Sequence, residues 1–542
     1  MTTPAHETPE QFRRRIEAEK LPDNLGALLD EAVARFGDRV AWIFVDQDRP
    51  SLSWRELGEL VARSANAFAA LGVKKGTHVG IMLPNVPETL AAWLAIAKLG
   101  AWMIPINPGY TPDELRYWLT DGEAELLLLD HACLDVYRAM QRQQPVLEAD
   151  RLVVYAGPGD GRMPLWDDLL AAAATRFAPR EPVALDDLVN IQYTSGSTGL
   201  PKGCMLSHRY WLQLGKVLSE AWPKFERIQC DLPFYYMGPL WRFAVAAYHG
   251  SALCVPPAYS LTRFRERVRD YRYDMGWMTN PVAMLPPDPI EQDNELKMIA
   301  IFGLSKDLHR EIERRYHAPV RESYGMTEIG FALYMPFADE HMSGSGSCGI
   351  VAPLREVMIA DPDGNPVPDG EIGELCVAGH GILQGYYRKP EATEAAFRGK
   401  WFRTGDLFRR DADGYYYIVG RIKDMIRRSA ENISVTEVED ALSTMPEIEE
   451  VAVHGVKDDK RGEEVKACVV LKSGYDPQRV PPEAVIAHAR QHLARFKVPR
   501  YVQYYAAFPR TISNKIAKKR LLDGEGEVLT ATFDSSDQSW LA

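Results

Sequence analysis

A buried strand is predicted at Leu188–Tyr193, and a turn rich in glycine and hydroxyl side chains follows it directly. Residues 193–203 read Tyr-Thr-Ser-Gly-Ser-Thr-Gly-Leu-Pro-Lys-Gly, and we name this segment the Gly/Ser loop. Gly196 and Gly199 allow a tight bend that brings backbone N–H groups close to an anion. A strand that runs into such a loop suits the binding of a polyphosphate.

The Gly/Ser loop also carries side-chain donors for phosphate oxygens. They are the point charge of Lys202 and the hydroxyl groups of Thr194, Ser195, Ser197 and Thr198. In the common P-loop the lysine follows the last glycine, and a serine or threonine comes next. Here Lys202 precedes Gly203, which disfavours a P-loop phosphotransferase. For this segment alone, a flexible surface turn is the alternative.

Further motifs follow the loop along the chain. They are Tyr324-Gly-Met-Thr-Glu328, Trp401-Phe-Arg-Thr-Gly-Asp406, Gly420-Arg421 and Pro509-Arg-Thr-Ile-Ser-Asn-Lys515. Together with the Gly/Ser loop, this series resembles the adenylate-forming superfamily, which includes acyl-CoA synthetases, firefly luciferase and the adenylation domains of nonribosomal peptide synthetases. Weaker segments at 98–105 and 373–379 match as well, so the resemblance spans almost the whole chain.

The resemblance implies a ligase that works in two steps with ATP, Mg²⁺ and coenzyme A. A carboxylate first attacks the α-phosphate of ATP, which gives an acyl-adenylate and pyrophosphate. A thiol, usually that of coenzyme A, then attacks the activated carbonyl. Both steps move negative charge, so positioning and electrostatic stabilisation are expected to dominate catalysis. The expected activity is that of an AMP-forming acyl-CoA synthetase acting on a small-molecule carboxylic acid.

The resemblance also implies individual roles. Tyr324 is expected to pack on adenine, Thr327 to lie beside the phosphates and Glu328 to bind Mg²⁺, an ion usually held by one or two carboxylates plus substrate oxygens. The alternative is a buried tyrosine and a glutamate at a helix start. Asp406 is expected to accept two ribose hydroxyls, with Arg421 near the same nucleotide; a structural ion pair between them is compatible with this role. The predicted ATP-binding set is Thr194, Ser195, Gly196, Ser197, Thr198, Gly199, Lys202, Tyr324, Thr327, Asp406 and Arg421.

Lys515, Lys202 and Thr198 are the residues that the resemblance makes catalytic. Lys515 is expected to approach the acyl-phosphate region from a small C-terminal domain, and rotation of that domain about a hinge at Lys423 would withdraw it and open a thiol channel. Without the resemblance, Lys515 and the lysines after it would indicate only a solvated basic face.

Three positions depart from the family pattern. Asn514 stands where glycine usually precedes the lysine, and asparagine tolerates the left-handed conformation that such a turn requires. Ala430 replaces a glycine near the thiol path, and Tyr236 replaces a common histidine. Ala430 and Asn514 leave open an alternative ligase that passes its acyl-adenylate to an amine or a carrier protein, whereas Tyr236 indicates a different gate to the acyl pocket.

The acid is expected to bind among side chains of three segments, 235–245, 301–305 and 324–333. The predicted pocket residues are Tyr235, Tyr236, Arg242, Phe302 and Phe331. The aromatic residues are equally consistent with ordinary core. If Arg242 points inward, it would pair with a second acidic group on the substrate, although most arginines lie at the surface.

Helix and strand patterns alternate before Gly370, as in layered α/β folds. A helix is predicted at 86–99, buried strands at 101–106 and 123–130, and short strands with Asp-Gly turns after Asp361. A compact α/β segment follows, with helices near 434–445 and 482–494 and strands at 415–419, 450–456 and 465–471. The resemblance, rather than composition, places the domain boundary near Gly420. It implies a large N-terminal multi-layer α/β domain with a β-rich subdomain (1–420) and a small mobile C-terminal α/β domain (421–542).

Composition and charge exclude some classes of binding partner for this chain. A net charge of −12 argues against nucleic acid or an anionic membrane surface as a partner. The most apolar window, 90–106, is broken by Lys98 and Gly100 and is too short for a membrane span. Seven scattered cysteines without metal-ligand spacing fit a reducing cytosol, so a cytoplasmic location is expected. The acid and the oligomeric state are left open.

A nucleotide-binding regulatory or scaffold protein without catalytic activity is the alternative from another functional class. It is disfavoured because Lys202, Glu328, Asp406, Arg421 and Lys515 are all present.

Overall fold

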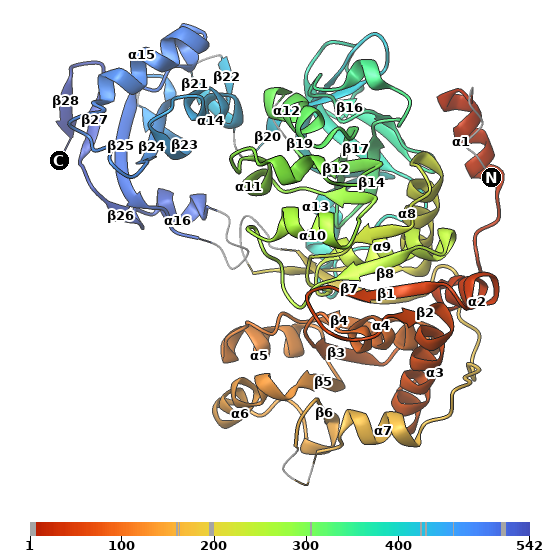
Figure 1. Ribbon diagram of the computed structural model, residues 1–542. Helices are drawn as coiled ribbons and strands as arrows, with labels where there is room; N and C mark the ends of the chain where they lie inside the picture. The colour runs from red at the N-terminus through yellow and green to blue at the C-terminus, as the bar shows by residue number, and fades with distance from the viewer. Residues whose placement is uncertain are drawn as a thin grey trace. The chain divides into compact units, whose positions relative to one another are not determined.

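The computed structural model describes residues 7–158, 161, 163–194, 200–303, 306–422, 425–428, 431–458, 460–510 and 516–541 (Figure 1). The chain forms two compact units, which we describe separately. Unit 1 consists of Met1–Val357 and Val377–Phe402, and unit 2 of Met358–Cys376 and Arg403–Ala542. The domain boundary at residue 420 and the hinge at Lys423 stay predictions, and Lys423 lies outside the described residues.

Unit 1 contains a six-stranded sheet in which all neighbours are parallel except the last pair. Its strands, in spatial order, are β6 (Leu152–Tyr155), β5 (Leu126–Asp130), β3 (His78–Met82), β4 (Trp102–Pro105), β7 (Leu188–Thr194) and β8 (Lys202–Ser207). Helices α5 and α6 lie over one face of this sheet (Figure 1). Their apolar side chains share a buried core with its strands. The buried leucines of β5 read as a continuous apolar run because both faces of a parallel sheet are covered.

A nine-stranded sheet is the second large sheet of unit 1. In spatial order its strands are β15 (Ile350–Val351), β14 (Gly330–Tyr334), β13 (Val320–Met326), β12 (Met298–Ile301), β11 (Met275–Trp277), β9 (Arg227–Gln229), β10 (Ala252–Val255), β1 (Val40–Phe44) and β2 (Leu52–Ser53). The strands from β13 to β1 are parallel to their neighbours, so their carboxyl ends share one edge. Ligands of open α/β sheets bind at such an edge.

The helices of unit 1 pack against these sheets and against one another, as α3 does on α4 and α8 on α9. They are α1 (Pro9–Ala18), α2 (Leu25–Phe36), α3 (Trp54–Ala70), α4 (Pro87–Leu99), α5 (Pro112–Asp121), α6 (Leu134–Gln143), α7 (Trp166–Ala172), α8 (His208–Ala221), α9 (Met237–His249), α10 (Phe264–Asp270), α11 (Asn280–Ala283), α12 (Lys306–Tyr316) and α13 (Pro390–Ala396). The helix predicted at 86–99 is confirmed as α4. It ends because Gly100 adopts φ = 67°, a left-handed conformation that glycine accepts at no steric cost.

A smaller sheet has the order β16 (Glu356–Ala360), β17 (Gly373–Ala378), β19 (Trp401–Arg410), β18 (Phe397–Arg398), with β20 (Tyr416–Arg421) paired to β19. The predicted Asp-Gly turns are present here. The N–H of Gly364 donates to the carbonyl of Asp361 at 3.0 Å, and Gly414 does the same to Asp411 at 3.1 Å.

The last sheet belongs to unit 2. Its order is β22 (Glu431–Ser434), β21 (Met425–Arg428), β24 (Gly462–Leu471), β25 (Tyr501–Ala507), β27 (Thr532–Asp534), β28 (Ser539–Leu541), with β23 (Ile448–Asp458) on β24 and β26 (Glu527–Val528) on β25. Helices α14 (Val435–Ser443) and α15 (Pro482–His492) share one buried core with this sheet, and α16 (Lys518–Leu522) follows. The strand and helix patterns predicted in this segment are confirmed.

Candidate active site

The Gly/Ser loop connects the ends of β7 and β8. Thr194 closes β7 and Lys202 opens β8, and the two residues are paired across the hairpin. The hydroxyl of Thr194 donates to the carbonyl of Lys202 at 3.4 Å. Five predicted site residues of this loop, Ser195, Gly196, Ser197, Thr198 and Gly199, lie outside the described residues, so their roles stay predictions.

Tyr386 brings Lys202 and Glu328 together within unit 1. The ammonium of Lys202 lies 4.5 Å from the centroid of the Tyr386 ring. The hydroxyl of the same tyrosine donates to Oε1 of the buried Glu328 at 3.1 Å. A cation, an aromatic ring and a carboxylate therefore adjoin the end of the Gly/Ser loop.

The surroundings of Tyr386 keep its hydroxyl protonated, so that it donates the hydrogen bond to Glu328. Burial and the neighbouring Glu328 carboxylate raise the pKa of its hydroxyl, so the proton stays on the phenol. Burial also raises the pKa of the Cys204 thiol well above its ordinary value. Cys204 is thus a packing residue and not a nucleophile.

Tyr324, Thr327 and Glu328 lie on a tight β-hairpin. Tyr324 is buried on β13, and β14 returns antiparallel after Ile329. Gly325 is required because a Cβ there would lie 2.2 Å from the carbonyl oxygen of Gly330. The alternative that Glu328 begins a helix is wrong, since it occupies the hairpin turn.

Asp406 and Arg421 form a cross-strand pair in unit 2. Their Cα atoms are register partners on β19 and β20, and Nε of Arg421 lies 2.9 Å from Oδ1 of Asp406. The carboxylate is buried while the arginine side chain is 59% exposed. The expected ion pair is present. Binding of ribose by Asp406 stays a prediction.

The predicted acid-pocket residues come from elements that end at one edge of the nine-stranded sheet. Tyr235 and Tyr236 precede α9, with ring centroids 4.7 Å apart. Phe302 follows β12 and is 42% exposed, whereas Phe331 on β14 is buried against Trp222.

Arg242 on α9 points inward: it is 2% exposed. Phe243 beside it packs on Trp54 and Trp93 and belongs to the ordinary core.

Sequence reasoning missed Tyr386. It lies 58 residues beyond Glu328, and neither periodicity nor spacing connects the two. Tyr110 was missed too; its phenol interacts electrostatically with Tyr235 and Tyr236. An excess of aromatic residues around 110–118 was the available signal.

Several predicted residues of unit 2 cannot be placed. Lys515, Asn514 and Ala430 lie outside the described residues, as does the hinge residue Lys423. In the ranges that the structure describes, no three His, Cys, Asp or Glu side chains gather as a metal site. None of the helices described combines the length and apolar composition needed to cross a membrane.

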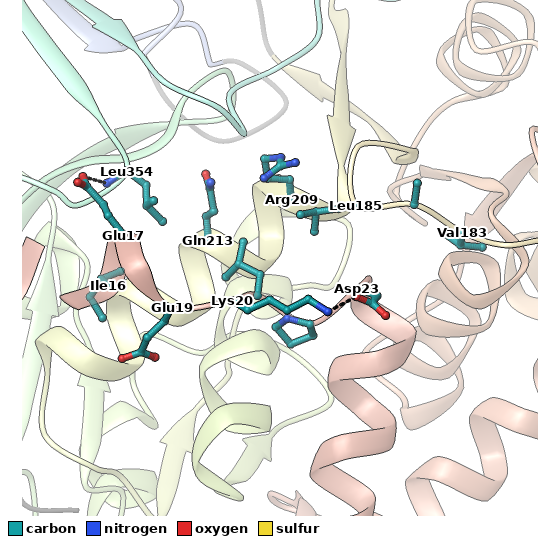
Figure 2. A pocket seen from close by; sticks show the side chains of 13 residues that line it. Ile16, Glu17, Glu19, Lys20, Asp23, Val183, Leu185, Arg209, Gln213 and Leu354 are labelled. Carbon is teal, nitrogen blue, oxygen red and sulfur yellow. Dashed lines mark hydrogen bonds and ion pairs between the residues drawn. The ribbon is translucent and has the colours of Figure 1, made fainter. Parts of the chain in front are cut away.

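A cavity of about 530 Å³ lies elsewhere in unit 1, between the segment after α1 and the start of α8 (Figure 2). Its wall carries charges of both signs, including an ion pair of Lys20 with Asp23 at 3.1 Å. None of the predicted site residues lines it.

Comparison with known proteins decides the family. The model of the AMP-binding enzyme family matches residues 29–387, and that of the AMP-binding enzyme C-terminal domain matches residues 437–515. This chain belongs to the AMP-binding enzyme family. The crotonobetaine/carnitine–CoA ligase of Salmonella agona (strain SL483) is 30% identical over 517 residues, which is 92% of this chain and 98% of that protein.

Solved structures of family members have the same fold. ATP-bound MatB from Rhodopseudomonas palustris is 27% identical with a TM-score of 0.82, over 93% of this chain and 99% of that one. A Mycobacterium tuberculosis fatty acyl CoA synthetase is 26% identical with a TM-score of 0.70, over 93% and 98%. The anthranilate CoA ligase AuaEII, at 22% identity over 94% and 98%, matches in fold with a TM-score of 0.83.

The matching family models and relatives confirm the expected superfamily and its acyl-CoA synthetase branch. The solved structures confirm the expected α/β fold with a large and a small domain. The same comparisons also confirm the expected activity, an AMP-forming acid–thiol ligase that activates a carboxylic acid with ATP and forms a coenzyme A thioester.

Proposed function

We propose that the cluster of Lys202, Tyr386 and Glu328 is where this ligase handles the phosphates of ATP and its Mg²⁺. The main support is that Tyr386 contacts both charged groups. Its ring centroid lies 4.5 Å from the ammonium of Lys202, and its hydroxyl lies 3.1 Å from the carboxylate of Glu328. Preorganised charges of this kind stabilise transferring phosphoryl groups without reorganising during the reaction.

In the first step a carboxylate oxygen of the acid bonds to the α-phosphorus while the bond to the bridging oxygen breaks, and pyrophosphate leaves. In the second step the thiolate sulfur of coenzyme A bonds to the carbonyl carbon, and AMP leaves with the former carboxylate oxygen. Lys202 and the predicted donors of the Gly/Ser loop, Thr198 among them, would hold the phosphates. Lys515 would add positive charge during the first step, and Asp406 with Arg421 would hold the ribose.

Glu328 fits a Mg²⁺ ligand by its chemistry. Magnesium is commonly bound by one or two protein carboxylates together with substrate phosphates, so a single buried carboxylate beside the Gly/Ser loop is sufficient. Bound there, the ion would supply charge neutralisation to the phosphates. Tyr386 would orient the Glu328 carboxylate through its hydrogen bond.

Coenzyme A is the preferred acceptor because two relatives described above, the crotonobetaine/carnitine–CoA ligase and the fatty acyl CoA synthetase, form CoA thioesters by name. Ala430 and Asn514 favour the second candidate, a ligase that transfers the acyl group to an amine or a carrier protein. We also propose a cytoplasmic location, because an odd number of cysteines, scattered singly along the sequence, fits a reducing compartment.

Mass spectrometry after incubation with ATP, Mg²⁺, coenzyme A and a pool of carboxylic acids tests the proposal. An acyl-CoA product supports it and reveals the acid. Acyl-adenylate without thioester would favour the amine or carrier-protein acceptor. Failure to release pyrophosphate with every acid would instead support a nucleotide-binding protein without catalysis.

A further inference from the structure

Arg242 lies at the edge of the nine-stranded sheet where the predicted acid-pocket residues gather. It stands in the second turn of α9, whose N-terminus follows Tyr235 and Tyr236. Long side chains on a helix point back toward its N-terminus, which directs the guanidinium to this edge. Its Cζ lies 4.4 Å from the ring centroid of Trp241 and 5.3 Å from that of Trp277, the last residue of β11.

Two N–H-bearing nitrogens of the Arg242 guanidinium have no hydrogen-bond partner among the residues that the structure describes. Arg242 is 2% exposed, and in the described part of the chain Nε and Nη1 donate to no acceptor. Gly238, one turn earlier, leaves room for it: a Cβ at that position would lie 2.8 Å from Nη1. Buried N–H groups of a charged side chain are costly when unpaired, so a group that binds them gains free energy.

None of the carboxylates that the structure describes forms an ion pair with Arg242. Asp231 acts on it electrostatically, but no ion pair joins the two among the residues described. Oδ2 of Asp231 instead lies 3.5 Å from Nη1 of Arg267, which also binds Asp46 at 2.8 Å. A cation that the fold has buried but not neutralised is available to an anion from outside.

The N-terminus of α9 adds to the positive field. Its first turn holds no acidic residue, and the N-cap residue Tyr236 makes no side-chain capping hydrogen bond. The helix dipole therefore reinforces the guanidinium at the same end of the helix. A carboxylate suits this place best, because its two oxygens match the paired N–H donors of arginine.

We propose that Arg242 makes this enzyme specific for dicarboxylic acids, with one carboxylate adenylated and the other bound by the guanidinium. This inference rests on the proposed function. It excludes carnitine as a substrate, because the quaternary ammonium of carnitine would lie against the buried guanidinium of Arg242. The two tryptophan rings would enclose the methylene chain between the carboxylates.

Competition in the wild-type enzyme tests the inference without any variant. The probes are an equimolar mixture of α,ω-dicarboxylic acids from malonic to suberic acid, the monocarboxylic acids of equal length, and carnitine. We expect the CoA thioesters of one or two dicarboxylic acids to dominate the products by at least about ten-fold. Dominant monocarboxyl- or carnitinyl-CoA would overturn the inference while leaving the proposed function intact. If no acid yields a thioester, the proposed function itself fails.

The variants Arg242→Gln and Arg242→Lys then test the residue. We expect Gln to lower kcat/KM for the preferred dicarboxylic acid about 100-fold and to leave that of the matching monocarboxylic acid within about three-fold. The Arg242→Lys variant keeps the positive charge but loses the planar guanidinium that binds a carboxylate through two hydrogen bonds. It should retain part of the preference for dicarboxylic acids. The control is Arg315→Gln, a buried arginine already paired with Glu291 at 2.8 Å, which should lower stability and leave the preference unchanged. An unaltered preference in Arg242→Gln would overturn the inference, and retained activity on the monocarboxylic acid verifies that the variant folds.

Discussion

Glu328 shows how one side chain depends on a partner far along the sequence. Its carboxylate is buried, and the hydroxyl of Tyr386 donates to it at 3.1 Å. The same ring faces Lys202, so the tyrosine has two separable contributions, one from its hydroxyl and one from its ring.

Replacing Tyr386 with phenylalanine separates these contributions. We expect Tyr386→Phe to lower kcat/KM for ATP about ten-fold, because a buried carboxylate loses a hydrogen bond while the ring still faces Lys202. Pyrophosphate release is the measurement. The control is Tyr387→Phe, whose hydroxyl donates to Glu123, and it should stay within about two-fold. Equal losses in the two variants would contradict the assigned role.

At the scale of elements, hydrophobic patterning predicted much of the fold. The helix α4 and the strands β4, β5 and β7 follow from apolar spacing and from Gly100 at the helix end. The hairpin at Tyr324–Leu333 was not predicted, because its turn depends on the close approach of Gly325 to Gly330, which spacing does not encode. For the same reason, the sequence indicated Lys202 and Glu328 but not the tyrosine between them.

Helices α2 and α8 are joined by a buried histidine that makes stability depend on pH. His208, the first residue of α8, accepts a hydrogen bond at Nδ1 from the backbone N–H of Leu25 at the start of α2, at 3.2 Å. Burial lowers the pKa of His208 from 6.5 to about 4. The unfolded chain binds this proton below pH 6.5 and the folded chain only near pH 4, so stability present above pH 6.5 is lost as pH falls through that window.

We expect His208→Asn to make the fall of the melting temperature between pH 6.5 and pH 4 shallower. Asparagine still offers an acceptor oxygen to Leu25 but does not titrate. The shift of the His208 pKa from 6.5 to about 4 corresponds to a loss of about 3 kcal/mol in the free energy of unfolding between neutral pH and pH below 4. His317→Asn, at an exposed position, is the control and should leave the slope unchanged. An identical slope in wild type and His208→Asn would refute the assignment.

At the largest scale, the residues that the family resemblance assigns to ATP come from the sequences of both compact units. The Gly/Ser loop, Tyr324, Thr327 and Glu328 belong to unit 1, whereas Asp406, Arg421 and Lys515 belong to the sequence of unit 2. Sequence motifs named residues from both units because family resemblance does not depend on where the units lie in space. Movement of the C-terminal domain between the two half-reactions stays a prediction of the family resemblance.

Lys515→Ala tests that separation. We expect acid-dependent pyrophosphate release to fall by at least about 100-fold, because a cation is lost where carboxylate and phosphate meet. Conversion of supplied acyl-adenylate and coenzyme A to thioester should continue. Lys518→Ala, a lysine paired with Glu439 at 2.8 Å, is the control and should leave both steps near wild type. Equal loss of both half-reactions would disprove the role of Lys515.

Activation of the acid as an acyl-adenylate is tested most directly by following its carboxylate oxygen into AMP. The enzyme is incubated with ATP, Mg²⁺, coenzyme A and its preferred acid labelled with ¹⁸O in the carboxylate, and the nucleotide is analysed by mass spectrometry. We expect AMP that carries one ¹⁸O, because the attacking carboxylate oxygen stays on the α-phosphorus when the thiol displaces AMP from the acyl group. Unlabelled AMP, or ADP with the label in inorganic phosphate, would contradict it.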